Sequence, residues 1–352
     1  MTTGFVDTSF SLAGTAKSFQ FSDGVNSRVF DFVNRQPMLN NLNLQLIKNG
    51  PIGGKVELSF GSDADIIASW PTANFNSSDV TAAYISGTAG PLTLQVGKYA
   101  TLAGAEVLES PSDLNFSRSI LFGFAIPFTH TGARLTWAAT STLSVIAGIN
   151  NGWDNTKGNG TGAHTGEGGL AYTNKNLSLS TQGYSGTEQT AYGYHNSIID
   201  VNGIPNNWSG VLGHRSVIDA VGTYKFGPVI TGILNYDDGR MTNVTTVNGA
   251  GTPNGVGVAS WNGLAGYISA ALTGKLTVTG RYEYFNDPQG FRTTFAQKWN
   301  EGTLTFAYAP STSLLFRAEV REDHSNQMPW LDGNGFPINR LSSLGLEAIA
   351  KF

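Results

Sequence analysis

The chain closes on LSSLGLEAIAKF, residues 341–352, in which apolar side chains occupy every second position up to the last residue. Leu344, Leu346 and Phe352 belong to one series, whereas Glu347 and Lys351 belong to the other. A repeat of two residues is typical of a β-strand whose two faces meet different surroundings. Because chain ends are commonly frayed and polar, a strand that continues to the final residue predicts a partner strand beside it.

The composition favours an all-β protein. Charged residues make up only 13% of the 352-residue chain, about half of the usual share, whereas glycine is plentiful at 44 residues. Aromatic residues at 11% and hydrophobic residues at 40% exclude a disordered chain. No stretch approaches the roughly 20 apolar residues of a transmembrane helix. That excludes a helical membrane protein but not a membrane barrel, whose strands need only about 10 residues of alternating polarity.

The residue inventory also excludes several kinds of chemistry. The chain has no cysteine, which excludes disulfides, thiolate catalysis and cysteine-based metal sites. A net charge of −4 argues against a nucleic-acid partner. The first residues, MTTGFVDTSF, lack the charged segment and the apolar core of a signal peptide. We interpret the chain as a mature form with an added Met rather than as a cytosolic protein, because the connections between strands favour export.

Alternating segments divide the chain into sixteen predicted strands, each bounded to within about 2–4 positions. They are Gly4–Lys17, Leu39–Ile47, Gly53–Ser62, Asp79–Ser86, Leu92–Tyr99, Thr131–Ala139, Leu143–Asn151, Gly166–Thr173, Leu177–Ser185, His214–Phe226, Val229–Asp237, Ser260–Leu272, Lys275–Asn286, Lys298–Ala309, Leu314–His324 and Arg340–Phe352.

The connections between these strands alternate in length. Seven short turns, such as NGPI and PSTS, alternate with eight long segments. An outer-membrane barrel has this arrangement, with short periplasmic turns and long extracellular loops, whereas a β-sandwich has no reason for it. We therefore predict a single domain over residues 1–352, a transmembrane antiparallel β-barrel of 16 strands with both termini periplasmic.

One strand-like stretch, Ser117–Phe128, does not fit the alternation as a strand of the wall. An additional strand there would place the two termini on opposite sides of the membrane. We therefore assign it to the third long loop, about residues 100–130, and expect this loop to fold into the lumen. A continuous wall strand at Ser117–Phe128 is the alternative.

Mid-strand charges lie on one face of each predicted strand. Arg134 and Thr136, for example, alternate with Leu135 and Trp137. A charge on the lipid face of a barrel costs about 2–4 kcal/mol at the bilayer midplane, so a barrel requires this segregation. A soluble β protein with the same alternation but the opposite face buried remains the alternative.

Aromatic residues cluster beside the short turns on the apolar face. This position predicts an aromatic girdle at the periplasmic interface. Its members are Tyr84, Trp137, Tyr172, Tyr224, Phe226, Tyr308 and Phe352, with Tyr236, Tyr282 and Tyr284 at the opposite rim.

The third loop carries a likeness to a known family. The stretches GKYATLAGAEVLES (97–110), NFSRSILFGFAIPFTHTGARLTW (115–137) and INNGWDN (149–155) resemble the OmpL-like family of β-barrel porins of Gram-negative bacteria, with a weaker echo in HRSVIDAVGTY (214–224). The resemblance implies a channel in the bacterial outer membrane and says little about its solute. It also implies that the last strand, with Gly345 and the final Phe352, is a signal read by the barrel assembly machinery.

Charged residues of the third loop and the wall are candidates for a constriction. In general porins an acidic inward loop faces basic wall residues, and charged rings tune selectivity. The loop candidates are Glu106, Glu109, Asp113 and Arg118, and the wall candidates are Lys55, Arg134, Arg215, Arg281, Arg317 and Arg321. Solvated loop residues without a role in the pore are the alternative.

Inward carboxylates balance the basic wall residues. They are Glu57, Glu167, Asp219, Glu283, Glu319 and Glu347. Arg281–Glu283 and Arg317–Glu319–Arg321 are expected to pair with one another in the lumen. Because the two signs are balanced, we predict weak ion selectivity.

The motifs give little support to catalysis, a cofactor or a metal. The five histidines lack HxxxH or HExxH spacing, and the glycine-rich stretch at 155–169 lacks the GK[ST] ending of a phosphate loop. Asp154–Gly162 also lacks the regular acidic spacing of a calcium loop. We expect no enzymatic activity, although an outer-membrane hydrolase remains an alternative.

The sequence therefore predicts an outer-membrane porin for passive diffusion of small hydrophilic solutes and ions. A substrate-specific channel and a non-conducting barrel that acts as a scaffold or adhesin are the alternatives. Expected partners are outer-membrane lipids, lipopolysaccharide, the assembly machinery and the solutes themselves. Porins of this strand count are commonly trimers, so a homotrimer is one state to consider.

Overall fold

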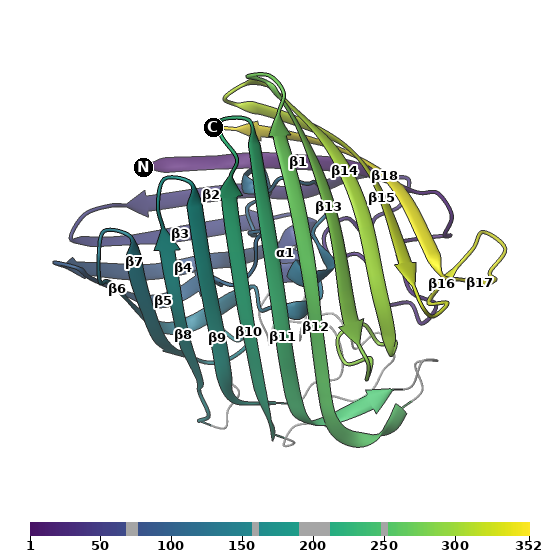
Figure 1. The fold of residues 1–352 in the computed structure, drawn as a ribbon, viewed down its shortest axis with the longest axis horizontal. Helices are drawn as coiled ribbons and strands as arrows, with labels where there is room; N and C mark the ends of the chain where they lie inside the picture. The colour runs from purple at the N-terminus through teal and green to yellow at the C-terminus, as the bar shows by residue number, and fades with distance from the viewer. Residues whose placement is uncertain (68–76, 157–161, 190–211, 248–252) are drawn as a thin grey trace.

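The computed structural model describes residues 1–67, 77–156, 162–189, 212–247 and 253–352. In this part of the chain sixteen strands form a closed antiparallel barrel, each paired with its neighbour in sequence (Figure 1). The barrel strands are β1 (Thr2–Ala13), β2 (Pro37–Lys48), β3 (Ile52–Phe60), β4 (Ser78–Ala89), β5 (Leu92–Ala100), β6 (Thr129–Ala138), β7 (Leu143–Asn150), β8 (Thr165–Thr173), β9 (Leu177–Gln189), β10 (Leu212–Lys225), β11 (Ile230–Val247), β12 (Pro253–Ala271), β13 (Leu276–Asp287), β14 (Gln297–Ser311), β15 (Leu314–Ser325) and β18 (Arg340–Lys351). The predicted barrel of sixteen strands is confirmed.

The connections contain five short elements. They are α1 (Ser62–Ile67), η1 (Ser110–Ser112), η2 (Leu121–Ala125), β16 (Trp330–Leu331) and β17 (Pro337–Ile338). None of the described helices has both the length and the apolar character needed to cross a membrane. The stretch Ser117–Phe128 contributes no wall strand, because β5 pairs directly with β6 and the stretch contains η2 instead.

The last strand closes the barrel against the first. β18 pairs with β1 on one side and with β15 on the other. The ladder extends to the final residue, since the Gly4 amide donates to the Phe352 carbonyl at 2.9 Å and the Phe352 amide donates to the Gly4 carbonyl at 3.0 Å. Leu346 and Phe352 are exposed on the outer face, whereas Glu347 and Ile349 are buried on the inner face. The partner strand predicted for the chain end is therefore β1.

Several strands differ in length from the prediction. β11 and β12 continue past the predicted ends at Asp237 and Ser260, with 18 and 19 residues. β1 ends at Ala13, four residues before the predicted end. Much of the long connection predicted between the ninth and tenth strands lies outside the described residues. Both chain ends lie at the end of the barrel that carries the short turns (Figure 1).

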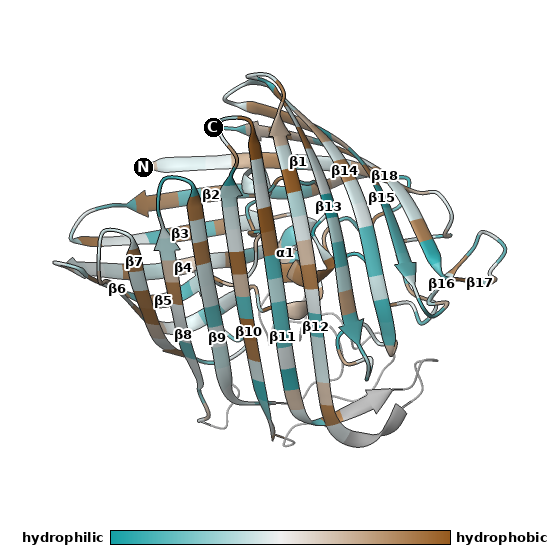
Figure 2. Cartoon of the chain, viewed as in Figure 1, coloured by the Kyte–Doolittle hydropathy of each residue, from teal (hydrophilic) through white to brown (hydrophobic). Residues whose placement is uncertain are grey.

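The outer face of the barrel is an apolar belt. Leu94, Leu135 and Ile268 are among its exposed side chains, and hydrophobic and hydrophilic bands alternate along the strands in Figure 2. Trp137 and Tyr308 are each 48% exposed beside short turns, as the girdle prediction requires. Outward apolar side chains of this kind are what a lipid-facing wall needs.

Tyr84 is the exception among the girdle residues. The pairing of β3 with β4 shifts register beyond Leu58, which lies opposite Val80, and leaves Thr81 as an extra residue. This β-bulge reverses the facing of the residues that follow it. Tyr84 therefore lies opposite Lys55 and faces the lumen. The prediction of a lipid-facing Tyr84 was wrong because alternation alone does not reveal a bulge.

The loops fill the interior near the long-loop end with an apolar cluster. Two of them, loop 1 (residues 14–36) and loop 3 (residues 101–128), contribute three buried phenylalanines each. Phe30 of loop 1 packs against Phe122 and Phe128 of loop 3, with ring centroids 6.2 and 5.5 Å apart. Phe21 of loop 1 packs against Trp330 of loop 8 (residues 326–339) at 5.8 Å. The inward fold of loop 1 was not predicted.

Candidate functional site: charged contacts between the inner loops and the wall

Loop 3 contacts strands on widely separated parts of the wall. Near its start, the Ala105 amide donates to Asn235 on β11 at 3.0 Å. At its middle, the Ser110 hydroxyl donates to Asp7 on β1 at 2.6 Å. The loop then returns, and Asn115 donates to Thr305 on β14 at 2.6 Å. Loop 3 therefore lies inside the barrel and crosses part of its lumen.

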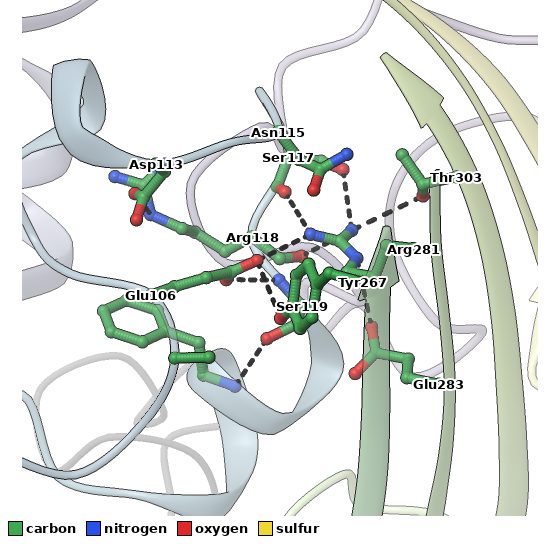
Figure 3. A network of polar contacts seen from close by, with 12 residues as sticks. Glu106, Asp113, Asn115, Ser117, Arg118, Ser119, Tyr267, Arg281, Glu283 and Thr303 are labelled. Atoms are coloured by element: carbon green, nitrogen blue, oxygen red, sulfur yellow. Dashed lines mark hydrogen bonds and ion pairs between the residues drawn. The ribbon is translucent and has the colours of Figure 1, made fainter. Parts of the chain in front are cut away.

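Glu106 joins loop 3 to a basic wall residue. Its carboxylate accepts from the Arg281 guanidinium at 2.8 Å and from the Tyr267 hydroxyl at 3.1 Å, and both wall residues are buried (Figure 3). Arg281 also pairs with Glu301 on β14 at 2.7 Å and donates to the Ser117 carbonyl at 2.7 Å. Such charge-assisted hydrogen bonds are about twice as strong as neutral ones.

The remaining loop 3 candidates are also paired. Glu109 contacts Lys55 on β3 at 3.1 Å, and this pair is only half-buried, with side-chain exposures of 26% and 16%. Asp113 contacts Arg118 of the same loop at 3.0 Å, and both are buried. Arg118 therefore stabilises loop 3 internally, and its guanidinium lies over the Phe30 ring at 5.2 Å.

The wall pairs differ from those expected. Arg281 and Glu283 are only loosely paired at 3.8 Å. Arg317 pairs with Glu347 on β18 at 2.6 Å, and Arg321 pairs with Asp323 at 2.7 Å. The predicted ladder Arg317–Glu319–Arg321 was therefore wrong, because the two arginines find nearer acceptors in carboxylates of the adjacent strands, in Asp323 on β15 itself and in carbonyls of loop 3. Arg317 also donates to the Ser110 carbonyl at 3.0 Å.

The last two basic candidates, Arg134 on β6 and Arg215 on β10, pair with carboxylates of the wall. Arg134 pairs with Glu167 at 2.7 Å and its guanidinium stacks over the Tyr99 ring at 4.1 Å. Arg215 pairs with Glu188 at 3.3 Å and lies over a tryptophan ring of the loop between β7 and β8 at 4.7 Å. Both arginines are buried, and neither contacts loop 3 carboxylates.

Two wall carboxylates hold the backbone of loop 3, and sequence reasoning gave them no such role. Glu319 on β15 accepts the amides of Phe116 and Ser117 at 2.8 and 3.0 Å. Glu283 on β13 accepts the amides of Ile120 and Leu121 at 2.6 and 3.1 Å. We call these two contacts the carboxylate clasps. The sequence identified both as inward acids but predicted arginines of their own strands as their partners rather than amides of loop 3.

Loop 1 is held by Arg28, which sequence reasoning also missed. This buried guanidinium contacts Asp31 at 3.0 Å and Asp323 on β15 at 2.6 Å. It also donates to the Ser343 hydroxyl on β18 at 3.0 Å. A charge in a connecting segment without periodicity gives no indication of whether it faces water or the lumen.

Two loop carboxyls are strongly affected by burial. Burial raises the pKa of Asp113 to about 7, with Arg118 opposing the rise and Glu106 adding to it. Burial likewise raises the pKa of Asp63 in α1 to about 7, with Arg118 opposing the rise and Glu347 adding to it. Desolvation outweighs the nearby guanidinium in each case, because the charged form of a buried carboxyl loses its hydration.

A closed, lipid-facing barrel with charged loops folded against its inner wall defines an outer-membrane porin. The family model described as "Putative beta-barrel porin-2, OmpL-like" matches residues 2–352. The chain belongs to this family of outer-membrane proteins. No protein with a curated description matches the chain in sequence.

Solved porin structures share the fold at low sequence identity. An anion-selective porin from Comamonas acidovorans is 12% identical, with a TM-score of 0.65 over 100% of this chain and 99% of that chain. OmpT of Vibrio cholerae is 11% identical, with a TM-score of 0.63 over 100% and 97%. The outer-membrane channel DcaP of Acinetobacter baumannii is 13% identical, with a TM-score of 0.62 over 100% and 96%.

Proposed function

We propose that this porin carries small hydrophilic solutes and ions by passive diffusion, with weak ion selectivity. The observation that supports it is the pairing of each loop 3 charge with an opposite charge: Glu106 with Arg281, Glu109 with Lys55 and Asp113 with Arg118. Paired charges present a smaller field to a passing ion than separated rings of one sign do. Loop 3 would then restrict the channel mainly by size.

The proposed constriction includes all ten charged candidates, in two different roles. Lys55 and Glu109 are half-buried and would border the water path. The other eight are buried and would hold loop 3 or the wall in place rather than meet the solute. Removing the Glu109 charge would leave Lys55 paired, among the described residues, with Glu57 at 2.5 Å.

Planar-bilayer recording tests this function. We expect stepwise conductance and a small reversal potential in a KCl gradient, and a shift toward anions in Glu109→Gln. Glu322→Gln is the matched control, because Glu322 is exposed on the outer face and pairs with Arg340. A strong preference of the wild type for one ion would contradict weak selectivity.

A non-conducting scaffold or adhesin is the second candidate. Its supporting observation is the apolar packing of loops 1, 3 and 8 within the barrel. An absence of conductance from a correctly folded protein would favour it over the diffusion function. We propose no catalytic reaction, and an esterase assay with serine-reactive probes tests that expectation.

The remaining proposals concern assembly and neighbours in the membrane. We place the short turns in the periplasm, assign Gly345 and Phe352 to the assembly signal, and expect contacts with lipid and lipopolysaccharide. One of the similar structures is described as a trimer form of OmpT of Vibrio cholerae. A homotrimer is the proposed state here, and cross-linking in native membranes tests it.

A further inference from the structure

Two apolar side chains that are exposed at least in part, Tyr84 and Val107, lie beside the half-buried charge pair of Lys55 and Glu109, one by strand pairing and one in sequence. Lys55 and Glu109 are the most exposed of the ten charged candidates. Tyr84 lies directly opposite Lys55 in the pairing of β3 with β4, so the two side chains are neighbours on the inner face. The Tyr84 ring is partly exposed, and its neighbour on β5 is Gly97, which has no side chain to cover it.

Loop 3 contributes its own exposed apolar side chains. In loop 3, Glu106 pairs with Arg281 of the wall and Glu109 pairs with Lys55 of the wall. Val107 lies between these two residues in sequence, and it is 42% exposed. Leu102, earlier in the loop, is 41% exposed. The carboxylates of Glu106 and Glu109 are thus paired with wall residues, whereas the apolar side chains of Leu102 and Val107 remain exposed.

An exposed apolar surface inside a porin meets only water and solutes, because the wall separates it from lipid. Exposed apolar groups on a protein commonly mark binding sites. An aromatic ring offers a face on which a flat apolar group can stack. A charge pair beside it provides hydrogen-bond donors and acceptors for the polar part of the same molecule.

We propose that Tyr84 and Val107, beside Lys55 and Glu109, form a binding surface for neutral solutes with one apolar face and one hydroxylated face. Aryl glycosides have this chemistry. The inference rests on the proposed diffusion function and deepens it, because it names a solute class that the channel retains.

Single-channel recording distinguishes this class from other sugars. Phenyl β-D-glucoside is the probe, and methyl β-D-glucoside is the control without an apolar face. In the wild type we expect longer current interruptions with the phenyl compound. Tyr84→Ser and Val107→Ser should each shorten them about three- to tenfold, the factor for losing one apolar contact. Tyr84→Phe should retain the long interruptions, because it keeps the ring.

A binding measurement separates the failure of this inference from the failure of diffusion. Calorimetric titration of the folded barrel in detergent with each glucoside requires no conductance. Suppose that the wild-type barrel does not conduct but binds the phenyl compound, and that Tyr84→Ser no longer binds it. This result would contradict the diffusion function and support the binding surface. Equal interruptions and equal binding for the two glucosides would overturn the inference, as would an unchanged response in both serine variants. If Tyr84→Ser does not fold, Val107→Ser in the loop decides the matter.

Discussion

The Arg28 guanidinium of loop 1 donates to the Asp323 carboxylate of β15 at 2.6 Å, and both side chains are buried. This ion pair ties the first long loop to a strand close to the end of the chain. Asp323 also contacts Arg321 at 2.7 Å, so it belongs to a network that joins loop 1 to the wall arginines. Loop 1 therefore depends on a few polar contacts in addition to its aromatic packing.

Removing the Arg28 charge should loosen loop 1. In Arg28→Met the Asp31 carboxylate loses its cation, and breaking a buried ion pair by removing one partner costs about 3–5 kcal/mol. We expect a higher and noisier single-channel conductance, together with earlier unfolding in urea. Arg35→Met, at an arginine near the end of the same loop, is the control. Unchanged conductance in Arg28→Met would show that aromatic packing alone holds loop 1.

The carboxylate clasps should position loop 3. A glutamine at 319 or 283 has one acceptor oxygen where the glutamate has two, and its amide group cannot accept from a backbone amide. Glu319→Gln and Glu283→Gln should therefore free part of loop 3 and raise the size limit for sugars in liposome swelling. Hydrogen exchange should become faster at the amides of Phe116 and Ile120, each in its own variant. Glu322→Gln should change neither measurement, because Glu322 faces outward from β15.

The wall of the barrel was predictable because its strands repeat one rule. β18 alternates up to Phe352, and the charges of β13 and β15 lie on the inner face with the exception of Glu322, so strand number and facing followed from periodicity. The bulge at Thr81 adds one residue to β4, and the sequence of this strand does not reveal it. For this reason Tyr84 was predicted on the wrong face of the strand. A bulge becomes visible only when the partner strand is known.

The sequence predicted that charged residues of loop 3 face charged residues of the wall, but it did not predict which residues form each pair. Opposite charges on loop 3 and the wall do meet, as Glu106 and Arg281 show. The inward fold of loop 1 was missed because aromatic residues such as Phe21 and Phe30 have no strand spacing there. Which carboxylate accepts from which amide depends on how the loops cross the lumen, and a single sequence does not contain that path.

Raising the pH should weaken the packing around α1. The folded pKa of Asp63 is about 7 against an ordinary value of 3.8, so the packed state binds the proton more tightly than the unpacked state does. The contribution of Asp63 to stability is therefore most favourable at low pH and falls as the pH rises from about 4 to about 7. Hydrogen exchange of residues 62–67 should accelerate over this range. Asp63→Asn should remove the dependence, whereas Asp65→Asn, at a partly exposed position that accepts from Ser77 at 2.9 Å, should retain it.

Gly345 has a packing role that is separate from assembly. A Cβ atom at this inward position would lie 2.6 Å from ring carbons of Phe116, and real Cβ contacts are not that short. Gly345→Val should therefore displace Phe116 and the clasped segment beside it, and so change the conductance. If this is the role of Gly345, the variant still inserts into the outer membrane and shows the usual heat-dependent shift on gels.

Phe352, the final residue, is the control for the two possible roles of Gly345. Phe352 is 60% exposed on the outer face and makes no contact with loop 3, so Phe352→Ala should reduce insertion without changing the conductance of the inserted barrels. A Gly345→Val variant that fails to insert would assign Gly345 to the assembly signal instead. The combined variant Gly345→Val with Phe116→Ala should restore the conductance, because the smaller side chain makes room for the added methyl groups.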